Sequence, residues 1–148
     1  MLMTNLSILS RLSRTFCERK LCDTNIGFTE QSILQFLSKS DNVNQDTIVK
    51  HFMLDKGSVA KTLNKLEEKD LINRTDNPNN KREKLITITE LGKSYSRTCQ
   101  NEIRELHSFL FEGLSTEEIK QFSKTIEIMT QNAIKAVQGR MDEYDSTE

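Results

Sequence analysis

The sequence predicts a mainly α-helical (α+β) fold in which a helix-turn-helix and a two-stranded hairpin are flanked by long helices. Three observations lead to this expectation. Apolar residues recur every three or four positions along most of the chain. One central stretch changes to β-branched residues around a turn-rich segment. Only one proline and five glycines interrupt the 148 residues, so long helices can form.

The first two predicted helices precede the helix-turn-helix. Apolar side chains at Leu6, Leu9, Leu12 and Phe16 form one stripe on an amphipathic N-terminal helix. A second helix is expected over residues 29–37, with Thr29 as its N-cap, because a threonine hydroxyl can accept a hydrogen bond from a free backbone N–H.

The third and fourth predicted helices form the helix-turn-helix. Asn44 is the expected N-cap of a short helix that carries Ile48 and Phe52, and Asp55 is the expected N-cap of the next. Only residues 53–55 connect the two, which is the connection length of a helix-turn-helix. Val59, Leu63 and Leu66 are expected to form the buried side of the fourth helix.

A hairpin with a long charged tip is expected next. Residues 71–75 and 84–89 are predicted to be two short strands. Residues 76–83, which are polar, basic and rich in turn formers, are predicted to be the tip. A hairpin that follows a helix-turn-helix is a wing, so the fold class is a winged helix-turn-helix with a two-stranded wing.

Two long helices are expected to follow the wing. One apolar stripe runs through residues 91–110 until Gly113. Ser115-Thr116-Glu117-Glu118 has the spacing of a capping box and begins the last helix. Its apolar residues, at positions 119–136, step alternately by three and four, which resembles a heptad pattern.

The outward side of the fourth helix carries groups that suit a nucleic-acid duplex. With the aliphatic side buried, Lys56, Ser58, Lys61, Thr62 and Lys65 can face outward and contact phosphates or base edges in a major groove. Residues 56–84 carry a net charge of +3, whereas residues 105–148 carry −5. The alternative is an ordinary solvated helix face, but the basic Asn-Asn-Lys-Arg tip of the wing favours DNA binding.

Four stretches then identify a family resemblance: Phe28-Thr29-Glu30-Gln31, and residues 61–74, 76–82 and 86–92. Together they resemble the MarR family of bacterial transcription regulators, over about 65 residues by motif. The resemblance implies a winged helix-turn-helix that dimerises through its N-terminal and two C-terminal helices. We therefore interpret residues 1–148 as one MarR-type domain, with the winged helix-turn-helix at 28–93 and dimerisation helices at 1–22 and 90–138.

The resemblance and the charge pattern together give an expected DNA-binding set: Lys56, Ser58, Lys61, Thr62, Lys65, Arg74, Lys81, Arg82 and Lys84. Three positions depart from the family pattern. Asp70 replaces the usual glycine of a left-handed turn, which aspartate tolerates at some cost. Asn80 and Lys81 replace the usual aspartate and first arginine of the wing, so Arg82 is the expected minor-groove side chain.

The apolar stripes of the terminal helices give the expected dimer interface: Leu6, Leu9, Leu106, Leu110, Ile119, Phe122, Ile126, Met129 and Ala133. The stripe is longer than a small winged domain needs to cover its own core. An antiparallel pairing of the two C-terminal helices within one chain is the alternative.

The expected function is a homodimeric, sequence-specific DNA-binding regulator that binds a pseudo-palindromic double-stranded operator. The resemblance implies a repressor released by a small aromatic effector. One alternative is a dimeric winged protein-interaction module that does not bind DNA. Another is a redox-sensing regulator with Cys17 as its reactive thiol, against the ordinary reading of small buried thiols.

Other function classes are not expected from this sequence. It contains no nucleophile motif, no glycine-rich phosphate loop and no pair of histidines or cysteines with metal-ligand spacing, so we expect no enzyme, no cofactor and no metal site. The three cysteines do not form a disulfide framework, and no run of apolar residues is long enough to span a membrane. We expect a cytoplasmic protein.

Overall fold

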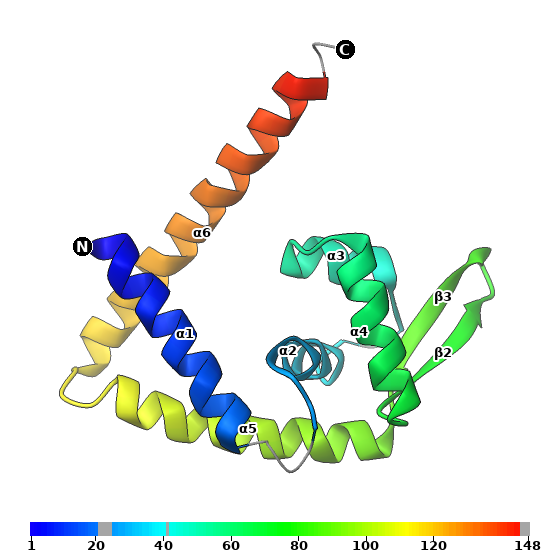
Figure 1. Ribbon diagram of the computed structural model, residues 1–148, viewed down its shortest axis with the longest axis horizontal. Coiled ribbons are helices and arrows are strands. Elements are labelled where there is room, and N and C mark those ends of the chain that lie inside the picture. Colours follow the sequence, from blue (N-terminus) through cyan, green and yellow to red (C-terminus); the bar gives the residue numbers. More distant parts are fainter. Residues whose placement is uncertain (21–24, 41, 146–148) are drawn as a thin grey trace. The chain divides into compact units, whose positions relative to one another are not determined.

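The computed structural model describes residues 1–20, 25–40 and 42–145, with side chains described up to Val137. The end of the predicted N-terminal dimerisation helix, residues 21 and 22, lies outside the described residues. The chain divides into two compact units, Met1–His107 and Ser108–Glu148. Figure 1 labels the helices and strands.

The first unit begins with helices α1 (Leu2–Lys20) and α2 (Phe28–Leu37). The prediction that Thr29 caps α2 is wrong, because the N-cap is Gly27, in an extended conformation, and Thr29 lies within the first turn. Glycine has no side chain with which to cap. Instead, the carboxylate of Glu30 accepts a hydrogen bond from the N–H of Gly27 at 3.3 Å.

Helices α3 (Gln45–Phe52) and α4 (Lys56–Glu68) form the helix-turn-helix, and both predicted N-caps are confirmed. The side chain of Asn44 accepts from the N–H of Thr47 at 2.9 Å, and that of Asp55 accepts from the N–H of Ser58 at 2.8 Å. Met53 adopts a left-handed conformation at the end of α3 and reverses the chain between the two helices.

The expected apolar side of α4 lies in the core of this unit. Val59, Leu63 and Leu66 are each fully buried, in one cluster with Ile48 of α3 and Leu34 of α2. Their burial fixes which face of α4 is outside.

Helix α4 ends in a Schellman motif at Asp70, which has a positive φ of 56°, as the glycine position in the family motif predicts. The N–H of Asp70 donates to the carbonyl of Glu67, and the N–H of Leu71 donates to that of Leu66. Leu71 and Leu66 are both buried in the core, so the turn directs the chain from α4 into the wing.

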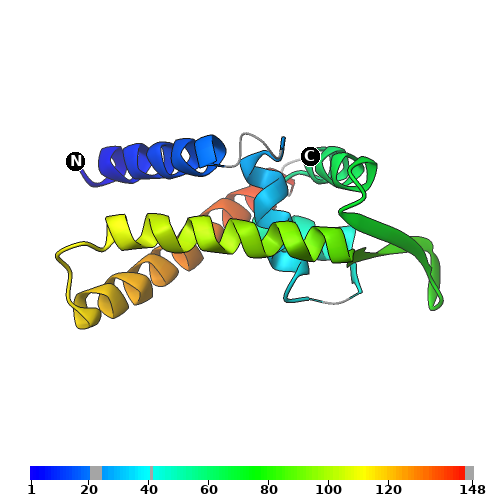
Figure 2. The ribbon, with the colours of Figure 1, turned by 90° about the horizontal axis from the view of Figure 1, so that it is seen from below.

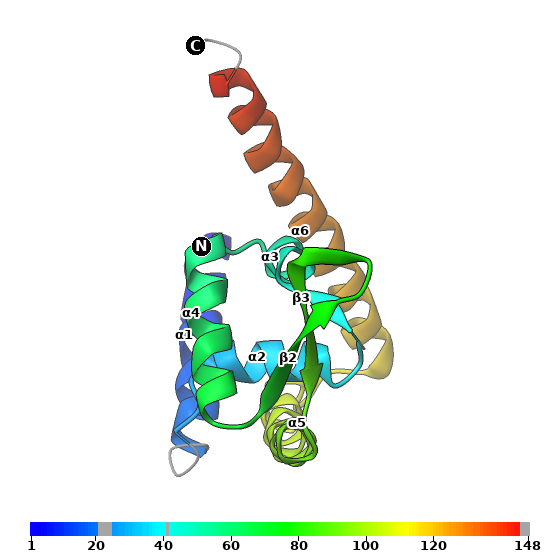
Figure 3. The ribbon, with the colours of Figure 1, turned by 90° about the vertical axis from the view of Figure 1, so that its right-hand side faces the viewer.

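The wing consists of β2 (Ile72–Asn77) and β3 (Asn80–Ile88), which pair antiparallel. The predicted eight-residue tip is wrong, because only Pro78 and Asn79 lie between the strands, which pair up to Asp76 and Lys84 and again, after a register shift, at Asn77 and Asn80. A third strand that we did not predict, β1 (Val43–Asn44), pairs with β3 to give the order β1-β3-β2. Figure 3 shows the hairpin beside α4.

Helix α5 (Glu90–Leu110) follows the wing after one residue, Thr89. The hydroxyl of Thr89 donates to the carbonyl of Asp70 at 2.7 Å and accepts from the N–H of Gly92 at 2.9 Å. Its N–H donates to the carbonyl of Leu71 at 3.1 Å. Thr89 therefore fastens both the end of α4 and the start of α5. Figure 2 shows α5 running on from the hairpin as one long helix.

The second unit contains helix α6 (Thr116–Asp145). Gly113, with a φ of 81°, precedes it at the predicted break. The predicted capping box is confirmed: the carboxylate of Glu118 accepts from the N–H of Ser115 at 2.8 Å, and the Ser115 hydroxyl accepts from the N–H of Glu118 at 3.3 Å.

Candidate nucleic-acid interface

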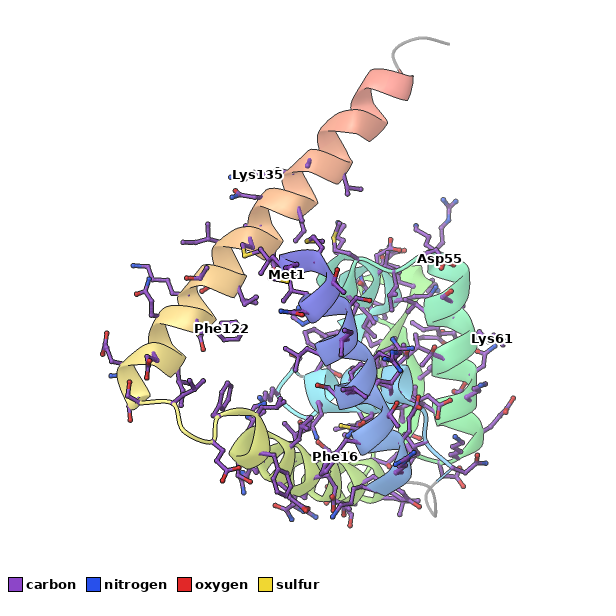
Figure 4. All side chains as sticks on the ribbon, turned by 60° about the vertical axis from the view of Figure 1, so that its left-hand side comes forward. Met1, Phe16, Asp55, Lys61, Phe122 and Lys135 are labelled. Carbon is purple, nitrogen blue, oxygen red and sulfur yellow. The ribbon has the colours of Figure 1, made fainter. Side chains whose placement is uncertain are left out.

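The outer face of α4 carries the side chains predicted to contact a duplex. Lys61 and Ser58 are exposed, and Figure 4 shows Lys61 projecting from the outer side of the helix. Thr62 is half-buried, and its hydroxyl donates to the carbonyl of Ser58 at 2.9 Å. Lys56 is exposed at the start of α4 and forms an ion pair with Asp46 of α3 at 3.0 Å. This face therefore offers cationic and hydroxyl groups to a partner.

The start of α4 is held by a charged cap. Hydrogen bonds from the side chain and the backbone of Ser58 lower the pKa of Asp55. The carboxylate therefore stays ionised at neutral pH and keeps the first turn ordered. Order at this end matters because side chains of the N-terminal half of a recognition helix are those that contact base edges.

Lys65 is tied to α2 rather than fully free. Its Nζ lies 3.6 Å from the carboxylate of Glu30, which is only 8% exposed. The same carboxylate binds Nζ of Lys69 at 2.7 Å, and Lys69 also donates to the carbonyl of Asn25. A single buried acid thus connects the segment before α2 with the C-terminal half of α4.

Arg74 was predicted to contact DNA, but its guanidinium is already engaged within the chain. Its Nη2 donates to the side-chain oxygen of Asn64 at 2.8 Å, and its Nε lies 3.5 Å from the carboxylate of Glu67. Both partners belong to α4. Arg74 therefore connects the wing to α4, a contact between distant positions that the charge pattern alone does not reveal.

The remaining predicted contacts lie on the wing. Lys81 and Arg82 are exposed next to the turn. Lys84 forms a cross-strand ion pair with Asp76 at 2.5 Å. Because Lys84 and Asp76 are 58% and 74% exposed, this pair contributes little to stability.

A polar pocket of about 330 Å³ joins the wing to the helix-turn-helix. Its basic lining comes from Lys56 of α4 and from Arg74, Arg82 and Lys84 of the wing. Of the nine predicted DNA-binding residues, these four are brought together here. Sequence reasoning missed the other polar lining residues, which are Asn44, Gln45, Asp46 and Glu83.

A second, open groove of about 440 Å³ separates α1 and α2 from α4. Lys61 and Lys65 line one side, and Arg14 and Phe28 line the other, with the Arg14 guanidinium 5.2 Å from the centre of the Phe28 ring. Leu54 adds apolar surface. The lining also includes two acids, Glu18 and Glu30, of which Glu30 is the ion-pair partner of Lys65.

The side chains of the predicted dimer set are not part of the buried core. Leu9, Leu110 and Phe122 are 38%, 38% and 44% exposed. Ala133 is exposed, and the others are half-buried: Leu6, Leu106, Ile119, Ile126 and Met129. Two apolar residues of α6 outside the predicted set, Ile128 and Val137, are 53% and 57% exposed.

The candidate redox cysteine is buried. Cys17 is 2% exposed, and burial, followed by the charges of Glu102 and Glu18, raises the pKa of its thiol. A peroxide-sensing cysteine requires the opposite shift, toward a thiolate at neutral pH. This environment weighs against the redox alternative.

Within ranges 1–20, 25–40 and 42–137, no three His, Cys, Asp or Glu side chains gather as metal ligands. No helix in the same part of the chain is long and apolar enough to cross a membrane.

Comparisons with known proteins agree with this geometry. Residues 28–84 match the model of the MarR family. The fold is similar to a MarR transcriptional regulator from Methanosarcina mazei Go1, with a TM-score of 0.83 and 23% identity over 90% of this chain and 96% of that one. It is also similar to a cysteine-to-serine mutant of E. coli MarR complexed with operator DNA, with a TM-score of 0.78 and 19% identity over 86% and 92%.

Part of the chain is also similar to a subunit of a tRNA ligase. The chain is 32% identical over 81 residues to the phenylalanine–tRNA ligase alpha subunit of Pyrococcus abyssi, a match that covers 55% of this chain. It spans only 15% of that subunit's length.

Proposed function

This chain carries a MarR-family domain, and on that premise we propose that the protein is a homodimeric, sequence-specific DNA-binding transcription regulator. The observation that carries the proposal is the exposed face of α4, where Lys61 and Ser58 stand outward while Val59, Leu63 and Leu66 anchor the helix. An ordered N-cap at Asp55 and the exposed Lys81 and Arg82 of the wing add to it.

In the proposed complex, each subunit places α4 in one major groove of a pseudo-palindrome, with half-sites about 34 Å apart. Lys61, Ser58 and Thr62 contact base edges or phosphates. Arg82 contacts the adjacent minor groove or its phosphates. Arg74 supports this geometry from within the chain, because its partners are Asn64 and Glu67.

The test is selection of bound duplexes from random DNA, followed by affinity measurements over a range of salt concentrations. Affinity should fall steeply with salt, with a log–log slope of about −0.9 for each phosphate contact. Lys61→Ala and Arg82→Ala should each weaken binding about tenfold, and Lys61→Ala should also change the preferred sequence. Lys135→Ala, on α6, is the control and should leave affinity unchanged.

The main alternative is a winged protein-interaction module. A purified protein that binds no duplex in a salt-dependent manner would contradict the DNA-binding proposal and favour that alternative.

We also propose dimerisation through α1, α5 and α6. The nine apolar residues of the predicted set remain partly or fully accessible in one chain, and burying them against a second copy would remove apolar surface from water. Phe122→Glu should shift the protein toward monomer in sedimentation equilibrium, whereas a change at the also exposed Lys124, Lys124→Glu, should not.

The finer proposal is a repressor that a small aromatic anion releases from DNA. The groove beside Arg14, Phe28 and Lys61 supports it by its position, because a ligand there would touch α1, α2 and α4 together. Its three cations, Arg14, Lys61 and Lys65, outnumber its two acids, Glu18 and Glu30. Such a ligand releases DNA only if it prefers the dimer conformation in which the spacing of the two recognition helices does not fit the operator. Benzoate should then lower DNA affinity of the wild type, and Arg14→Ala should reduce that response.

A further inference from the structure

Two basic side chains of the wing, Lys81 and Arg82, lie on an irregular part of the hairpin. Strands β2 and β3 pair residue by residue from Ile72 and Ile88 to Asp76 and Lys84. The next pair is Asn77 with Asn80, so residues 81–83 have no paired position on β2. We name residues 81–83 the wing bulge. Regular strand pairing does not determine its direction, so other contacts must do so.

Glu83 supplies such contacts. Its carboxylate accepts a hydrogen bond from the side-chain amide of Asn44 at 3.2 Å and from that of Asn77 at 3.4 Å. Asn44 is also the N-cap of α3, and Asn77 ends β2. One half-buried carboxylate therefore connects the wing bulge to the helix-turn-helix and to the opposite strand.

Charge alone does not explain an acid at this position. Glu83 lines the same pocket as Lys56, Arg74, Arg82 and Lys84, the four cations gathered between the wing and α4. A negative charge there would repel an approaching phosphate. If residue 83 carried no acceptor, however, the side-chain amides of Asn44 and Asn77 would both lose a hydrogen-bond partner. A carboxylate or amide oxygen at residue 83 therefore meets a structural need.

We propose that Glu83 is a positioning residue: by binding Asn44 and Asn77 it directs the wing bulge, and with it Arg82, toward the duplex without contacting DNA itself. This inference rests on the proposed DNA-binding function. It assigns to one carboxylate the direction of the wing bulge relative to the start of α3 and the end of β2.

The experiment compares Glu83→Ala and Glu83→Gln by hydroxyl-radical footprinting on a duplex selected by the wild type. Glu83→Ala removes the acceptor, so protection at the minor groove beside each half-site should be lost and affinity should fall about tenfold. Glu83→Gln keeps an acceptor oxygen and removes the charge, so the wild-type footprint should remain and affinity should be equal or higher. Glu127→Ala on α6 makes the same charge change as the alanine variant and should behave as the wild type.

A second variant protects the test against misfolding. Asn77→Ala removes one of the two donors and should weaken the same flanking protection while leaving the major-groove protection in place. Unchanged flanking protection in both Glu83→Ala and Asn77→Ala would overturn the inference alone. Equal loss of protection in Glu83→Gln and Glu83→Ala would also overturn it, because charge and not hydrogen bonding would then be responsible. A wild type that protects no duplex would instead overturn the proposed function.

Discussion

Gly92 packs so closely against Leu71 that a Cβ atom on Gly92 would lie 2.1 Å from the carbonyl oxygen of Leu71. The same Cβ would lie 2.7 Å from a side-chain carbon of Ile88. Neither obstacle is the far end of a flexible side chain, since Leu71 presents its backbone and the Ile88 atom is Cγ1, which is bonded directly to Cβ. The first turn of α5 can therefore approach the wing only because residue 92 is glycine.

Gly92→Ala should lower the free energy of unfolding by at least about 2 kcal/mol, because the backbone of the wing and α5 must separate to admit the methyl group. Urea unfolding at fixed protein concentration measures the change. Gly57→Ala is the control, since a Cβ there would meet only the Asp55 side chain, at 3.3 Å. Equal stability of Gly92→Ala and wild type would show that this approach is not needed.

Asp70→Gly should stabilise the fold by about 0.5–1 kcal/mol. Asp70 has a φ of 56°, a region in which glycine is not strained. Asp70→Ala should have the opposite effect, because alanine tolerates this region less well than aspartate. The two variants have to be compared by thermal unfolding, and a stabilising effect of alanine would contradict the explanation.

Glu30→Gln should lower the free energy of unfolding by about 2 kcal/mol. The buried carboxylate holds Nζ of Lys69 at 2.7 Å and the N–H of Gly27 at 3.3 Å, and hydrogen bonds to charged groups are the stronger kind. The exposed Glu68 of α4 provides a matched control, and Glu68→Gln should change the stability by less than about 0.5 kcal/mol. A similar loss in both variants would mean that the ion pair with Lys69 contributes no more to the free energy of unfolding than an exposed carboxylate does.

The stability of the protein should decrease at alkaline pH because of Cys99. Burial raises the pKa of this fully buried thiol from 9.0 to about 11. The folded state thus keeps a proton that the unfolded state loses, so the contribution is complete below pH 9 and disappears as the pH rises from 9 through 11.

The expected loss over that range is on the order of 2 kcal/mol. Cys99→Ala should remove this part of the pH dependence, and comparison with the wild type cancels the titration of lysines and tyrosines. Parallel stability curves of the two proteins between pH 8 and 11 would refute the assignment.

Local signals in the sequence predict most of the fold. Asn44, Asp55 and Ser115 are caps whose partners lie within three residues, so the local sequence is enough to find them. The left-handed turn at Asp70 is likewise local. The prediction of Thr29 as a cap was wrong because the N-cap is Gly27, which has no side chain, and the N–H of Gly27 donates to Glu30 instead. No composition rule anticipates this arrangement. Strand β1 has only two residues, too few for any periodicity.

The candidate interface was less predictable, because its geometry depends on contacts between distant positions. The sequence correctly places Lys61 outside and Val59 inside, since helical periodicity determines faces. It cannot reveal that Glu30 binds Lys65, or that Asn64 and Glu67 engage Arg74. Glu83 carries no sequence signal either, because its role arises only when β1 and the wing bulge meet.

The junction at Thr89 does not let the wing move independently of α5. One residue separates the end of β3 from the start of α5, and its hydroxyl and amide are bound to Asp70, Leu71 and Gly92. A hinge needs a residue whose backbone dihedral angles can change freely, and three hydrogen bonds restrict Thr89. Any tilt of the first turn of α5 therefore moves the hairpin in the same direction.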